Sequence, residues 1–362
     1  MQLRTSHFGE GARRCRRRIG PSHGRYAHTF AALDLGTNNC RLLIARPFVH
    51  GNGFQVIDAF SRIVRLGERV AETGLLSPAA IERTLRALRV CSGKMDRCGV
   101  TRVRGVATEA CRRADNCDEF LGLVRGETGI ALDIITSDEE AELGLVGSAP
   151  LLNSDVRYAL VFDIGGGSTE LMFVELTATG QPNVIDVTSL PCGVVTLSEC
   201  YGGHDVLPDT YEAMVGDTLS LLAPFETANG ISARVQASEL QMLGTSGTVT
   251  TLAAVNLGLP KYDRSQVDSS WIGRHAIATT SHMLARMSYR ERAEHPCIKR
   301  DRADLVVAGC AILEAIMRSW PVPKVRVADR GLREGILLEL MAAADREDGI
   351  GANSPLRSSA DP

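Results

Sequence analysis

The 362-residue sequence lacks several features that would assign it to a familiar class of protein. None of its ten cysteines forms a C-x-x-C pair, and their spacing fits neither a zinc site nor a small disulfide scaffold. No apolar run approaches the roughly 18 residues that span a membrane. The formal net charge is -3, so bulk charge does not make the chain a nucleic-acid binder. We therefore expect a cytoplasmic protein with mostly buried, free thiols, no membrane association and no specific nucleic-acid partner.

Common catalytic and nucleotide-binding motifs are absent as well. Gly165-x-Gly167 has Glu170 where a dinucleotide-binding fingerprint needs glycine or alanine, and we expect a strand rather than a helix after it. No G-x-x-x-x-G-K-[ST] motif occurs, which excludes a P-loop enzyme. The eight histidines do not cluster, and no Ser–His–acid arrangement is visible. Any anion site must therefore be built locally from loop amides, a few cations and metal.

The length suits two domains, each with its own core. Residues 1–28 stand apart because they hold five arginines between positions 13 and 18 and no apolar stretch follows, so we expect no export signal. We expect this extension to be disordered, with a polyanion-capturing arm as the alternative. The chain then divides into four predicted parts: the extension (1–28), an N-terminal domain (29–150), a C-terminal domain whose last helix packs back on the first (151–344), and a polar tail (345–362).

A weak internal repeat links the two predicted domains. Each contains a strand, an Asp-x-Gly turn with small polar residues, and a second strand. The matching positions are Asp34 with Asp163, Gly36 with Gly165, and Leu42 with Leu171. If two similar halves face each other, both turns lie at the entrance of the same cleft between them.

The two Asp-x-Gly turns predict a site for phosphate and metal. Glycines allow close approach of the backbone to an oxyanion, and the hydroxyls of Thr37, Ser168 and Thr169 add donors without bulk. A carboxylate beside bound phosphates repels them unless Mg2+ lies between the two. The alternative for a single turn is tight geometry alone, but two matching turns favour the phosphate site.

Two further segments are candidates for binding anions. Residues 244–248 form a small-residue loop that opens a helix, whose free N–H groups suit phosphate, although an ordinary start capped by Ser246 or Thr248 is the alternative. The pair Arg112-Arg113 follows a buried strand and offers planar donor forks. A solvated surface pair explains the two arginines equally well.

The acidic run at residues 138–142 is the place to look for a general base. A carboxylate near bound phosphate can orient and deprotonate water for attack on phosphorus. Ser137-x-x-Glu140 also has the form of a capping box, in which Glu140 would reach back to the Ser137 amide. Spacing alone favours capping over catalysis.

Several of these stretches together resemble one known family, that of exopolyphosphatases and guanosine pentaphosphate phosphohydrolases, in the actin, Hsp70 and sugar kinase fold group. The D-I-G-G-G-S-T-E and L-R-E-G strings are quite specific. The matching stretches, in the order of the family, are residues 32–39, 137–142, 161–170, 189–195, 244–248 and 329–335.

The resemblance implies an α/β fold of two ribonuclease H-like domains that enclose a cleft for the phosphate chain. It also implies a role for Glu140 as the general base, which raises this residue above the capping interpretation. The resemblance implies that Asp163 is a ligand of the Mg2+ cofactor, with Glu170 and Asp34 as less certain neighbours of this ion. Phosphate binding falls to Thr37, Asn38, Asn39, Arg112, Gly166, Gly167, Ser168, Thr169, Ser246 and Gly247.

The expected activity is release of terminal phosphate from inorganic polyphosphate. Guanosine pentaphosphate is the alternative substrate, a regulator with an inactive site is a third reading, and a sugar-kinase-like transferase is allowed by the fold alone. Many relatives continue into a further helical domain, so the chain resembles the short two-domain type, and a homodimer is an open expectation. The first loop reads G-T-N-N where many members have G-S-N-S, a mild change that keeps hydroxyl and amide donors.

Overall fold

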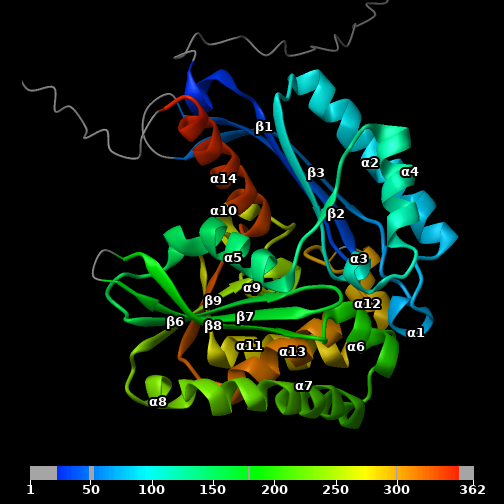
Figure 1. Ribbon diagram of the computed structural model, residues 1–362. Helices are drawn as coiled ribbons and strands as arrows, with labels where there is room; N and C mark the ends of the chain where they lie inside the picture. Colours follow the sequence, from blue (N-terminus) through cyan, green and yellow to red (C-terminus); the bar gives the residue numbers. More distant parts are fainter. Residues whose placement is uncertain (1–22, 49–52, 178–179, 299, 350–362) are drawn as a thin grey trace, which may run out of the picture.

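The computed structural model describes residues 23–48, 53–177, 180–298 and 300–349. Its strands form two separate sheets, each flanked by helices (Figure 1). Among the described residues, no helix is both long enough and apolar enough to cross a membrane. The alternation of helix and strand around two sheets agrees with the expected α/β class.

The first sheet has the strand order β3-β2-β1-β4-β5. Strands β1, β2 and β3 form an antiparallel meander, while β4 and β5 continue parallel to β1. Every residue of β1 is buried, as expected for a central strand with both faces covered. The strands are β1 (Phe30–Leu35), β2 (Asn39–Pro47), β3 (Phe54–Ile63), β4 (Arg102–Ala107) and β5 (Asp133–Ile134).

The second sheet repeats this topology. Its order is β10-β11-β9-β6-β7-β8, in which β6, β7 and β8 form the meander and β9 and β11 lie parallel to β6. The added strand β10 pairs antiparallel with β11 at the edge. The strands are β6 (Tyr158–Ile164), β7 (Thr169–Leu176), β8 (Pro182–Leu190), β9 (Leu240–Thr245), β10 (Trp271–Gly273) and β11 (Lys324–Val327).

Most of the helices cover the outer faces of the two sheets (Figure 1). The helices of the first half are η1 (Gly24–Ala27), α1 (Val70–Thr73), α2 (Pro78–Cys98), α3 (Glu109–Arg113), α4 (Cys117–Thr128), α5 (Ser137–Ser148) and η2 (Ala149–Leu151). In the second half they are α6 (Val194–Tyr201), α7 (Pro208–Asn229), α8 (Ile231–Gln236), α9 (Ser246–Asn256), α10 (Arg264–Val267), α11 (Arg274–Arg286), α12 (Tyr289–Glu294), η3 (Arg300–Arg302), α13 (Val306–Ser319) and α14 (Leu332–Glu347).

Helices α5 and α14 lie between the two sheets (Figure 1). Leu143 of α5 joins the core of the first sheet together with Ile336 of α14, whereas Ala141 and Leu145 join the core of the second sheet. The two helices cross closely, because a Cβ on Gly335 would overlap the Leu143 carbonyl. The start of α5 is thereby fixed where the two halves meet.

Two described elements extend past the expected boundaries. We expected order from about Thr29, but η1 already forms at Gly24–Ala27, and the expected tail from residue 345 includes the last turn of α14. The physical reason is an ion pair: Arg25 donates to the buried carboxylate of Asp345, which ties the two segments together. Most of the extension and of the tail lies outside the described residues.

Candidate active site in the interdomain cleft

The two Asp-x-Gly turns have the same backbone geometry. The Gly36 amide donates to the Asn39 carbonyl at 2.9 Å, and the Gly165 amide donates to the Ser168 carbonyl at 2.9 Å. Asp34 stands one residue before the end of β1, and Asp163 stands in the same place on β6. The two turns of the internal repeat therefore share the same backbone hydrogen bond.

Both turns open into one cleft of about 510 Å3 between the halves. Twelve of the fourteen predicted site residues line it: Asp34, Thr37, Asn38, Asn39, Glu140, Asp163, Gly166, Gly167, Ser168, Glu170, Ser246 and Gly247. Two do not. The Thr169 hydroxyl donates to the Cys192 carbonyl at 2.6 Å, so it braces the turn from behind. Arg112 lies behind Glu140.

Seven carboxylates line the cleft, and four of them, Asp34, Asp163, Glu170 and Glu140, lie on β1, β6, β7 and α5. Burial raises the pKa of Asp34 and of Asp163. Burial also raises the pKa of Glu170 to about 7, and the charge of Asp163 adds to this effect. Burial and then the charge of Glu170 raise the pKa of Glu140 well above its usual range. Such mutual repulsion is typical of a site that holds a cation.

Glu140 does not cap its helix. The N-cap of α5 is Thr136, whose hydroxyl accepts from the Glu139 amide at 3.1 Å, so the capping-box interpretation of Ser137 and Glu140 is wrong. The Glu140 carboxylate instead accepts from the Arg112 guanidinium at 3.0 Å. Arg112 also donates to the Ile135 carbonyl, which fixes the side chain of Glu140 at the cleft wall. The surface-pair alternative for Arg112 is therefore wrong as well.

Two buried donors in the cleft lack a partner. Among the described residues that line the cleft, the Ser246 hydroxyl and the Arg302 Nε are buried and make no hydrogen bond. Buried polar groups are normally paired, so orphaned donors around one cavity favour an anionic ligand. Ser246 also has a φ of 102° at the start of α9, a strained conformation for a residue other than glycine. The N-cap of α9 is Thr245, so the alternative of a helix start capped by Ser246 or Thr248 is wrong.

Sequence reasoning missed five arginines that line the cleft: Arg41, Arg264, Arg302, Arg330 and Arg333. Arg264 and Arg330 already pair with carboxylates, those of Glu334 and Asp268. Arg41 occupies the position in the first hairpin that Glu170 occupies in the second. Arg41 pairs with Asp34 across the first hairpin, and Glu170 pairs with Asp163 across the second. That alignment was a usable signal for Arg41. Burial lowers the pKa of Arg302 to about 10, and burial also lowers the pKa of Arg333. Arg333 stands in the L-R-E-G string, which was a usable signal, whereas nothing in the sequence separates Arg302 from surface arginines.

The donor set fits Mg2+. The oxygens of Asp34, Asp163 and Glu170 are the hard ligands that this ion prefers. Glu170 is held in place by hydrogen bonds from Ser168 and from Ser189, the latter at 3.0 Å. Such support orients a ligating carboxylate.

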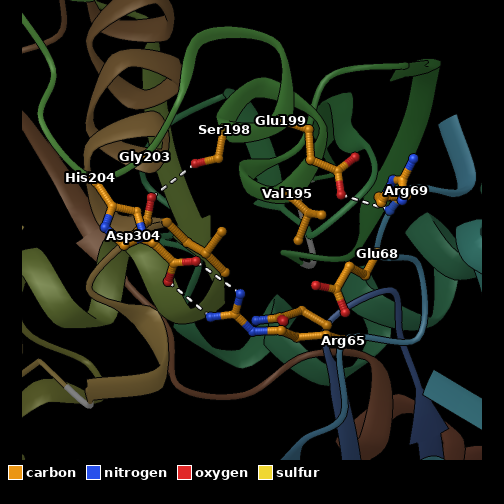
Figure 2. A pocket seen from close by; sticks show the side chains of 11 residues that line it. Arg65, Glu68, Arg69, Val195, Ser198, Glu199, Gly203, His204 and Asp304 are labelled. Carbon is orange, nitrogen blue, oxygen red and sulfur yellow. Dashed lines mark hydrogen bonds and ion pairs between the residues drawn. The ribbon is translucent and has the colours of Figure 1, made fainter. Parts of the chain in front are cut away.

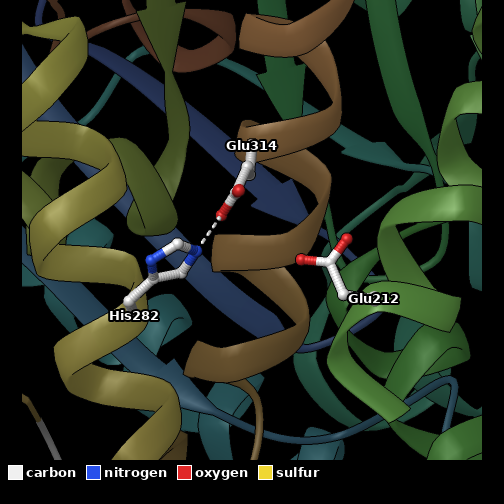
Figure 3. A group of neighbouring side chains, drawn as sticks. All are labelled: Glu212, His282 and Glu314. Atoms are coloured by element: carbon white, nitrogen blue, oxygen red, sulfur yellow. Dashed lines mark ion pairs between the residues drawn. The ribbon is translucent and has the colours of Figure 1, made fainter. Parts of the chain in front are cut away.

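A second group of possible metal donors lies away from the cleft. Glu212, His282 and Glu314 come from three helices and point toward one another (Figure 3). Arg318 already donates to both carboxylates, at 2.8 Å to Glu212 and 2.6 Å to Glu314. Tyr211 donates to Glu314 as well, at 2.7 Å. Both carboxylates of this cluster already have hydrogen-bonding and charged partners, so they do not need a metal ion.

Residues 44–344 match the model of the Ppx/GppA phosphatase family. The chain belongs to this family. The membership confirms the expected enzyme class, a phosphoric anhydride hydrolase.

Individual relatives agree with this assignment. The chain is 31% identical over 326 residues to exopolyphosphatase 2 of Mycobacterium tuberculosis, covering 86% of this chain and 98% of that protein. The PPX-GPPA enzyme of Aquifex aeolicus has a TM-score of 0.70 and 29% identity, over 86% of this chain and 99% of that one. An exopolyphosphatase of Cytophaga hutchinsonii has a TM-score of 0.77 at 24% identity, over 90% and 100% of the two chains, and supports the fold alone. The expected two-domain, actin-like architecture is thus confirmed.

Proposed function

We propose that the protein is an Mg2+-dependent exopolyphosphatase that releases phosphate from the end of inorganic polyphosphate. The observation that carries this proposal is the meeting of three kinds of group in one cleft. Two glycine turns and the start of α9 offer backbone amides, Arg41, Arg302 and Arg333 offer positive charge, and four carboxylates offer a base and metal ligands. A linear polyanion needs the first two, and its hydrolysis needs the third.

The substrate would lie along the two turns and the N-terminus of α9. Its phosphate oxygens would accept from the orphaned donors of Ser246 and Arg302, which removes the cost of leaving these groups buried and unpaired. Gly247 leaves room for this, because a Cβ there would lie 2.6 Å from the Arg302 guanidinium. Loop amides and arginines stabilise the charge that builds on the transferred phosphoryl group.

Mg2+ held by Asp34, Asp163 and Glu170 would neutralise the charge of the terminal phosphates. The chain's own contribution to bond cleavage is the carboxylate of Glu140, which takes a proton from water as the water oxygen attacks the terminal phosphorus. The bond between that phosphorus and its bridging oxygen breaks, and inorganic phosphate and a chain shorter by one unit leave. Arg112 holds the carboxylate in place while this happens.

Guanosine pentaphosphate stays the alternative substrate, and one observation favours it. The cleft is also lined by Pro296, Ile298 and Leu305, which offer apolar surface of the kind a nucleobase contacts. A bare polyphosphate chain gains nothing from that surface.

The test is phosphate release from long polyphosphate and from guanosine pentaphosphate, at matched concentrations of hydrolysable ends, with Mg2+ and with a chelator. Faster release from polyphosphate that stops on chelation supports the proposal. Preference for the nucleotide moves the substrate to the alternative and keeps the site. Tight binding without release from either indicates a regulator, and ATP-dependent phosphorylation of an added alcohol indicates a kinase.

A further inference from the structure

A short segment of the first domain, residues 64–69, packs against the first Asp-x-Gly turn, residues 34–39. We call this turn the first phosphate turn. The amides of Val64 and Arg65 both donate to the Asn38 carbonyl, at 2.9 and 3.1 Å, and the Gly67 amide donates to the Thr37 carbonyl at 2.9 Å. Arg65 adopts a φ of 48°, which is uncommon for a residue other than glycine. The segment is therefore held in one conformation by the turn that it supports.

The same segment reaches across to the second domain. Figure 2 shows the Arg65 guanidinium against Asp304, with a pair of hydrogen bonds of 2.9 and 3.0 Å. Arg65 also donates to the Asp301 carbonyl at 3.0 Å. Farther along, the Arg69 amide donates to Glu199 of α6 at 2.7 Å (Figure 2). Two residues of this segment, Arg65 and Arg69, thus contact three residues of the second domain.

The Arg65–Asp304 pair is better placed than a surface ion pair. The side chains are only 33% and 15% exposed, and the two parallel hydrogen bonds have the planar fork geometry that is strongest for Arg and carboxylate. Exposed single-bonded pairs contribute little by comparison. The carbonyl of Asp304 is itself held by the Ser198 hydroxyl at 2.9 Å, so the acceptor is fixed to the second domain.

Asp304 stands two residues after Arg302, the buried cation of the cleft. Arg302 in turn donates to the Asn39 side chain at 3.4 Å, on the first phosphate turn. The turn and Arg302 are therefore linked twice, once directly and once through Arg65 and Asp304. The cavity beside this link, about 260 Å3, shares Asn38 and Leu305 with the cleft.

We propose that Arg65 is a positioning residue, and that the Arg65–Asp304 pair is an interdomain clasp. It sets the distance between the first phosphate turn and Arg302, so that both contact the same polyanionic chain. The clasp joins groups on opposite sides of the cleft, so it favours the closed arrangement over any open one in which the pair is broken. Its effect on substrate rests on the proposed function, whereas its effect on domain closure does not.

The experiment is a double-mutant cycle with Arg65→Gln, Asp304→Asn and the double variant. KM and kcat are measured for polyphosphate, and small-angle X-ray scattering reports the domain opening of the substrate-free protein. Glu68→Gln is the matched control, because it removes an ion pair with Arg83 from the same segment but within one domain. Arg65→Lys tests whether charge without the planar fork is enough.

Each single variant should raise KM about 10-fold with kcat changed less than threefold, and the double variant should add nothing further, as expected for one shared interaction. The radius of gyration should rise in all three, stay unchanged in Glu68→Gln, and recover only in part in Arg65→Lys. Loss of folded protein would instead lower kcat at constant KM. Additive effects in the cycle, or an unchanged radius of gyration in both single variants, would overturn the clasp. If the wild type releases no phosphate, the proposed function fails and scattering alone decides the clasp.

Discussion

Replacing Gly335 by alanine should separate the two helices that place Glu140. A Cβ at this position would overlap the Leu143 carbonyl oxygen and would lie 2.8 Å from its carbon, where ordinary contacts between carbon atoms need about 3.5 Å or more. The overlap with the oxygen is larger than the shortfall to the carbon, so helices α5 and α14 must move apart by about 1 Å or more. Overpacking of this kind costs about 1–3 kcal/mol of unfolding free energy.

The same displacement should reduce catalysis, because Glu140 lies on the first turn of α5. A misplacement of about 1 Å can cost on the order of 100-fold in rate, so we expect kcat of Gly335→Ala to fall about 10- to 100-fold. Gly144→Ala on the same helix is the control, since a Cβ there meets nothing within 4 Å. It should gain about 0.5–1 kcal/mol and keep full activity. Urea unfolding and phosphate release measure both effects. Wild-type stability and turnover in Gly335→Ala would refute this account of how α5 is held.

Two further predictions concern helix capping and titration. Thr136→Ala should lower the unfolding free energy by about 1 kcal/mol while Ser137→Ala leaves it unchanged, because Thr136 is the N-cap; equal losses in urea unfolding would contradict the assignment. Burial raises the folded-state pKa of Glu170 to about 7, so ionisation in the unfolded chain removes stability as pH rises from about 4.5 through 7. Metal-free Glu170→Gln should therefore gain stability relative to wild type between pH 5 and pH 8. A pH-independent difference in melting temperature in chelator would count against it, and Mg2+ should stabilise the wild type more at pH 8 than at pH 5.

Local sequence patterns predicted much of the fold correctly. Ser77 caps α2 and Pro78 opens it, as their order indicated, and the buried run before Asp34 became the central strand of its sheet. The repeat of Asp34 and Asp163 predicted two matching hairpins, and these share one hydrogen-bond pattern. Such features depend on neighbours within a few residues, which the sequence displays directly.

Features that depend on long-range contacts were not predictable. Whether Glu140 capped a helix or faced the cleft depended on Arg112, which is remote in sequence and offers a second partner. Arg302 resembles its neighbour Arg300 in sequence, and only the packing of η3 against the cleft distinguishes it. The position of η1, inside the expected extension, was likewise set by Asp345, at the opposite end of the chain.

The most direct test of the central claim is turnover of Glu140→Gln on polyphosphate with Mg2+, beside Glu139→Gln as the control. Glu139 pairs with Arg104 and does not line the cleft, so its variant should keep near-normal turnover. Glu140→Gln should lose at least about 100-fold in kcat while it still binds polyphosphate, the scale usual for a general base. Near-normal turnover in Glu140→Gln would contradict the assignment of the base and with it the proposed mechanism.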